Sequence, residues 1–99
     1  MALVNSRGLL RDARANGYAV GAFNVENMEM MQAVIAAAEA EHAPVILQTT
    51  PSTLKYAEPA VFAAMARAMA GKASVPVAMH LDHGDRFGPV SYTHLTLPT

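Results

Sequence analysis

The chain has 99 residues, of which 53% are apolar and 15% charged, a balance too hydrophobic for an intrinsically disordered segment. Its formal net charge of −1 comes without a basic cluster, which argues against nucleic acid or an anionic membrane surface as a partner and leaves small molecules as the expected ligands. Cysteine is absent, so any metal ion has to be held by imidazole and carboxylate groups.

The first predicted element is a helix over about residues 6–16. Apolar residues recur in it at helical spacing, Asn5 or Ser6 is suited to the N-cap, and Gly17 is suited to end the helix. Charged residues interrupt this region, so it does not resemble a signal peptide, and no apolar run in the chain reaches the roughly 20 residues that cross a bilayer. We therefore expect a soluble, cytoplasmic protein.

Three short apolar runs without polar alternation follow, at about residues 18–25, 44–49 and 75–82. Such runs predict strands that are buried on both faces. The segments between them have helical periodicity, at about residues 27–42 and again from Pro59 to a stop at Gly71 and Lys72. Strands that alternate with helices pair in parallel through right-handed crossovers, so the predicted fold class is α/β.

In barrels and open sheets of this class, ligands bind where the strands end at their carboxyl ends. Here the three ends carry polar side chains, namely Asn24, then Thr49 and Thr50, and finally Asp82 and His83. Because loops are polar in any case, this pattern by itself leaves a shared site and ordinary loops both open. Three strands cannot close a barrel, which predicts that the chain is the start of a longer protein.

The stretch HLDH, residues 80–83, ends the third predicted strand. Side chains alternate along a strand, so His80 and Asp82 share one face, and His83 follows just beyond. A carboxylate beside a metal-bound imidazole can move a proton while the metal polarises a carbonyl group. One histidine does not make a zinc site, however, and an incidental HLDH in a solvated loop remains the alternative interpretation.

The last ten residues, VSYTHLTLPT, differ in character from the chain before them. They are also the translation of a sequencing-library transposase adapter, read as GTC TCT TAT ACA CAT CTG ACG CTG CCG ACG. We therefore expect residues 1–89 to be the genuine protein and residues 90–99 to be an adapter-derived tail without a functional role. Reading the nucleotide sequence of this region checks the expectation, since other codons would contradict it.

The order GYAVGAFNV, NMEMMQAVIAAAE, HAPVILQTTPST and VPVAMHLDHG resembles the N-terminal part of the class II, zinc-dependent ketose-bisphosphate aldolases. The resemblance covers nearly all of residues 1–87 and implies the first three strand–helix units of a truncated (β/α)8 TIM barrel. The segment TTPST is more similar to the tagatose-bisphosphate branch, whereas HLDHG also suits fructose-bisphosphate members. The substrate branch therefore stays open.

The resemblance implies a lyase of carbohydrate metabolism that reversibly cleaves a ketose 1,6-bisphosphate to dihydroxyacetone phosphate and glyceraldehyde 3-phosphate. On the matching positions, Asp82 would be the catalytic proton donor and acceptor and His83 the first zinc ligand. Asn24 and Thr50 would bind the substrate, and His80 would support the end of the third strand. The other zinc ligands, the phosphate-binding loops and a monovalent cation site would lie outside this chain, and the full-length protein would be a homodimer or homotetramer.

Because the site is incomplete, we expect the 99-residue chain itself to be inactive and to bind no zinc tightly. Two alternatives to the aldolase remain. One is another metal-dependent TIM-barrel enzyme, such as a hydrolase in which Asp82 itself binds the metal or activates water. The other is a non-catalytic α/β fragment in which HLDH has no role.

Overall fold

The computed structural model describes residues 3–50 and 59–81 of the chain. Its three strands are β1 (Gly21–Asn24), β2 (Val45–Thr49) and β3 (Val77–Leu81), and they form one sheet in the order β1-β2-β3. Both pairs of neighbouring strands are parallel. The structure thus confirms the predicted α/β class. Residues 51–58, which follow β2, and the whole of residues 90–99 lie outside the described residues.

Helix α1 (Ser6–Asn16) has the capping residues that the sequence indicates. The side chain of Asn5 accepts a hydrogen bond from the backbone N–H of Arg7 at 2.7 Å, and Gly17 ends the helix with a φ of 70°, a left-handed conformation that glycine adopts without steric cost. Just before the helix, the N–H of Val4 donates to the carbonyl of Val77 at 2.9 Å. This bond ties the start of α1 to the beginning of β3.

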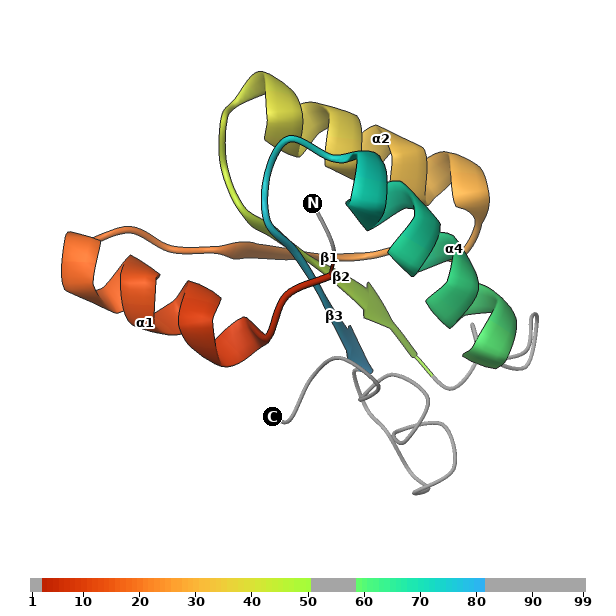
Figure 1. Cartoon of the computed structure of the whole chain (residues 1–99), viewed down its shortest axis with the longest axis horizontal. Helices are drawn as coiled ribbons and strands as arrows, with labels where there is room; N and C mark the ends of the chain where they lie inside the picture. The colour runs from red at the N-terminus through yellow and green to blue at the C-terminus, as the bar shows by residue number, and fades with distance from the viewer. Residues whose placement is uncertain (1–2, 51–58, 82–99) are drawn as a thin grey trace.

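Helices α2 (Met28–Ala40) and α4 (Pro59–Lys72) lie side by side over one face of the sheet, as Figure 1 shows, while α1 lies apart from them. Asn27 caps α2 by accepting a hydrogen bond from the N–H of Met30 at 2.8 Å. Buried apolar side chains from both helices and from β2 and β3 form the core. Its largest fully buried members are Phe62, Met31, Leu47, Met79, Val25 and Val77.

Strand β1 differs from the prediction in length and in burial. The apolar run of residues 18–25 predicts a strand buried on both faces, but the strand begins only at Gly21, and all four of its residues are exposed. Both β1 and β3 lie at edges of the sheet with β2 as their strand partner, but β3 is also flanked by the N-terminal segment through the bridge between Leu3 and Val77. Among the described residues, β1 has no such neighbour on its outer side, which leaves it open to solvent. Strands β2 and β3 match the prediction better, because the residues from Val45 to Leu47 and from Val77 to Met79 are buried.

Within the described ranges, no helix is both long enough and apolar enough to cross a membrane.

Candidate functional site at the carboxyl ends of the strands

The two faces of the sheet have different roles. Phe23 and Val45 line a pocket together with residues of α2, so this set of alternate strand positions faces the helices. Asn24, Gln48 and His80 are direct neighbours in the parallel register and occupy the other set of positions. They therefore lie together on the face turned away from α2 and α4, at the carboxyl end of the sheet.

These three side chains form a hydrogen-bonded row across the strands. The amide Nε2 of Gln48 donates to Oδ1 of Asn24 at 3.1 Å. On the other side, Oε1 of Gln48 lies 3.2 Å from Nδ1 of His80. Asn24 is exposed, whereas Gln48 and His80 are half-buried, so the row runs from solvent at β1 to a more enclosed position at β3. We call Asn24, Gln48 and His80 the polar row.

Gln48 was not among the sequence-predicted site residues, although it is the central member of the row. The signal for it was a polar residue inside the apolar run of β2, at a position where alternation directs its side chain to the same face as His80 on the parallel partner strand. That inference needs the register between the strands, which the periodicity of a single strand does not supply.

The other predicted residues are distributed differently. Thr50 directly follows β2 and is half-buried, and Asn24 belongs to the polar row. Thr49 does not share this side, because its position alternates with Gln48 and it is completely buried. Asp82 and His83 lie outside the described residues, immediately after β3 in the sequence. The structure therefore places two of the four predicted site residues, Asn24 and Thr50, at the carboxyl end of the sheet.

A zinc ion is not accommodated by the described residues alone. Within residues 3–50 and 59–81, no three side chains of histidine, cysteine, aspartate or glutamate are grouped so that they could hold a metal. The polar row contains one imidazole and two amides, and amide groups are poor zinc ligands in comparison with imidazole and carboxylate. A zinc site at this end of the sheet would thus need ligands from outside the described residues.

Two features lie away from the carboxyl end of the sheet and do not contribute to the candidate site. The pKa of Tyr18 is raised, first because its hydroxyl donates a hydrogen bond to the carboxylate of Asp12, with burial and the charge of Asp12 adding to the effect. Tyr18 lies before the start of β1, whereas the polar row lies at the strand ends. The pKa shift therefore concerns the connection between α1 and the sheet and not the candidate site.

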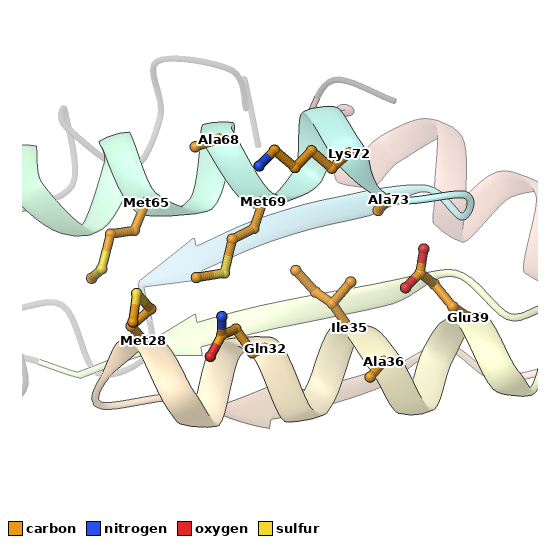
Figure 2. Close-up of a pocket in the computed structure, with 10 residues that line it drawn as sticks. All are labelled: Met28, Gln32, Ile35, Ala36, Glu39, Met65, Ala68, Met69, Lys72 and Ala73. Carbon is orange, nitrogen blue, oxygen red and sulfur yellow. The ribbon is translucent and has the colours of Figure 1, made fainter.

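The second feature is a groove of about 460 Å³ between α2 and α4, shown in Figure 2. Methionine side chains from both helices point into it, with Met28 on one side and Met65 and Met69 on the other. Glu39 and Lys72 lie at one end. The groove is on the helix-covered side of the sheet, so it is separate from the polar row.

Thr49 provides a test of the internal packing beneath these helices. Its side chain is 0% exposed, and its hydroxyl has no hydrogen-bond partner among the described residues. A buried hydroxyl without a partner costs free energy that an apolar group of the same shape avoids. We therefore expect Thr49→Val to raise the free energy of unfolding by about 1 kcal/mol, measured by urea denaturation. Thr49→Ser is the matched control, because it keeps the hydroxyl and loses a methyl group, and it should instead destabilise by about 1 kcal/mol. A lower stability for the valine variant would show that the hydroxyl is satisfied.

The sequence matches the family model "Fructose-bisphosphate aldolase class-II" over residues 4–94. A fructose-bisphosphate aldolase of Thermus caldophilus is 49% identical over 88 residues, which are 89% of this chain and 28% of that protein. The family resemblance seen in the sequence motifs is thereby confirmed.

The fold is also similar to that of solved aldolases. The crystal structure of the YdjI aldolase from Escherichia coli K12 superposes with a TM-score of 0.84 at 36% sequence identity. The match covers 96% of this chain and 38% of YdjI. The three parallel strands and their helices are therefore the corresponding part of an aldolase (β/α)8 barrel, and the chain spans less than two fifths of the length of these relatives.

Proposed function

Because the chain belongs to the class-II fructose-bisphosphate aldolase family, we propose that the longer protein to which it corresponds is a zinc-dependent aldolase that cleaves a ketose 1,6-bisphosphate. The products are dihydroxyacetone phosphate and glyceraldehyde 3-phosphate, and the reaction is reversible. The whole protein would act in the cytoplasm as a homodimer or homotetramer, with a phosphorylated sugar as its substrate.

The observation that best supports this proposal is the polar row at the carboxyl ends of β1, β2 and β3. Ligand sites of (β/α)8 barrels lie at this end of the strands, and a sugar bisphosphate needs hydrogen-bonding groups there. Asp82 and His83 follow β3 directly in the sequence, so the residues with the proposed chemical roles come from the same strand end as His80.

Each proposed residue has a distinct task. Asp82 donates and accepts the proton at the hydroxyl group next to the carbon–carbon bond that breaks, which is general acid–base catalysis. His83 is the first protein ligand of zinc, and the metal, when bound, supplies Lewis-acid polarisation of the substrate ketone. Asn24 and Thr50 hydrogen-bond the substrate through their amide and hydroxyl groups and hold it in place. A monovalent cation would bind elsewhere in the complete barrel.

A chimeric enzyme tests the function. The matching part of this chain replaces the corresponding segment of the Thermus caldophilus aldolase, and the product is assayed for cleavage of both fructose 1,6-bisphosphate and tagatose 1,6-bisphosphate. We expect a zinc-containing enzyme that cleaves at least one of them, and the ratio of the two kcat/KM values assigns the substrate branch. The 99-residue chain alone is expected to bind no stoichiometric zinc and to be inactive.

Two results would contradict the proposal. A folded, zinc-loaded chimera that hydrolyses a phosphorylated sugar in a chelator-sensitive manner, without carbon–carbon cleavage, would favour a metal-dependent hydrolase. A folded chimera that binds zinc and has no activity on either sugar would favour a fragment whose HLDH stretch has no catalytic role. Stoichiometric zinc and turnover in the isolated 99-residue chain would contradict the expectation that the site is incomplete.

A further inference from the structure

Gln48 uses both ends of its side-chain amide, and the two ends are chemically different. Its Nε2 group is a donor and faces Oδ1 of Asn24 at 3.1 Å. Its Oε1 atom is an acceptor only and faces Nδ1 of His80 at 3.2 Å. The hydrogen bonds of the polar row therefore point in a single direction across the three strands.

This direction determines which nitrogen of His80 carries the proton. Since Oε1 of Gln48 cannot donate, the hydrogen bond forms only when Nδ1 of His80 is protonated. In the neutral imidazole, Nε2 then has no proton and presents a lone pair. At the other end of the row, Oδ1 of Asn24 accepts from Gln48, which orients the Asn24 amide so that its donor group, Nδ2, faces away from Gln48.

The backbone around Gln48 holds its side chain between its two partners. Gln48 lies in the central strand, its Cα is in register with Asn24 on one side and with His80 on the other, and its carbonyl accepts a hydrogen bond from the N–H of Val25 at 2.9 Å. Neighbouring strands are about 4.8 Å apart, so the amide bridges both neighbours at once. If the amides of Gln48 and Asn24 were both turned over, the hydrogen bonds in the row would reverse, and Nε2 of His80 would carry the proton.

We propose that Gln48 is a positioning residue, which fixes the Nδ1–H tautomer of His80 and so presents an unprotonated Nε2 at the end of β3 and an amide donor of Asn24 at the end of β1. The acceptor Nε2 of His80 and the donor Nδ2 of Asn24 then lie on opposite sides of Gln48. This pair suits a polyhydroxylated ligand, because one hydroxyl group can donate to His80 while another accepts from Asn24. Only this choice of ligand rests on the proposed aldolase function. The tautomer itself follows from the orientation of the Gln48 amide in the row, whatever the ligand.

The tautomer is measured by nuclear magnetic resonance on the chain labelled with ¹⁵N-histidine, without zinc or substrate. Long-range ¹H–¹⁵N correlations at about pH 8.5, where unperturbed histidines are neutral, show which ring nitrogen is protonated. The chain contains four histidines, and the signal that disappears in His80→Phe identifies His80. We expect His80 to be predominantly the Nδ1–H form.

Two substitutions of Gln48 separate positioning from packing. Gln48→Glu keeps an acceptor beside His80 and should preserve the Nδ1–H form. Gln48→Lys places a donor there and should shift His80 predominantly to the Nε2–H form. Gln32→Lys is the matched control, because Gln32 is exposed on α2, and it should leave the tautomer unchanged.

An Nε2–H form in the unsubstituted chain, or no shift with Gln48→Lys, would overturn the proposal. The same spectra are recorded in the aldolase chimera, so a variant that unfolds in the isolated chain is still measured within a complete barrel. Failures of the two proposals are distinguishable. A folded chimera that lacks aldolase activity but contains the Nδ1–H form contradicts the aldolase function alone, whereas an active chimera with the Nε2–H form contradicts the role of Gln48 alone.

Discussion

Replacing Asp82 by alanine in the aldolase chimera is expected to lower kcat for cleavage by about 10²–10⁴-fold, the usual contribution of a general acid–base group. Zinc content should stay unchanged, because in the proposed mechanism Asp82 moves a proton and does not bind the metal. His83→Ala should remove both the activity and the metal, since it deletes a proposed zinc ligand. Steady-state kinetics and elemental analysis of the purified variants measure the two effects.

The chain itself provides a matched control for this experiment. Asp85 is a second aspartate of the same segment, three residues beyond Asp82, and has no proposed role, so Asp85→Ala should keep nearly full activity and metal content. Normal turnover by the Asp82→Ala variant would show that the proton-transfer assignment is wrong. Loss of zinc from that variant would instead favour Asp82 as a metal ligand, as in the hydrolase alternative.

Leu47→Ala is expected to lower the free energy of unfolding by about 2–5 kcal/mol, which is a large fraction of the stability of any small domain. Leu47 is 0% exposed in the central strand β2, where it pairs in register with Phe23 and Met79. Removing its side chain loses the transfer free energy of the buried methyl groups and leaves a cavity beneath the helices. Urea denaturation followed by circular dichroism measures the change.

Leu10→Ala is the matched control for the core substitution. The side chain of Leu10 is 51% exposed on α1, so the same chemical change should alter stability by no more than about 0.5 kcal/mol. Equal effects of the two substitutions would show that β2 does not lie at the centre of a packed core in solution. A variant Leu47→Ala that shows no cooperative unfolding agrees with the prediction, provided that the Leu10→Ala variant unfolds cooperatively.

Much of the fold could be predicted because its signals are local. Gly17 ends α1 in a left-handed conformation, and Asn27 caps α2, in each case close to the predicted boundary. The apolar runs of β2 and β3 are buried as predicted. These features depend on a residue and its near neighbours in the chain, and periodicity reports on them directly.

The candidate site could be predicted only in part. Because ligands of this fold class bind at strand ends, Asn24 and Thr50 could be predicted as site residues, and the structure places both at the carboxyl end of the sheet. The same rule did not separate Thr49, which faces the helices, from the residues on the other face. Gln48 was missed because its importance arises from two partners that lie 24 and 32 residues away in the sequence.

The sequence by itself determined the alternation of helices and strands, the parallel sheet that this alternation requires, and the aldolase family to which the motifs point. Only the tertiary structure decided that β1 is an exposed edge strand and that Asn24, Gln48 and His80 form one row. The physical reason is that secondary structure follows from local sequence, whereas burial at an edge and contacts across strands depend on which strands pair and in which register.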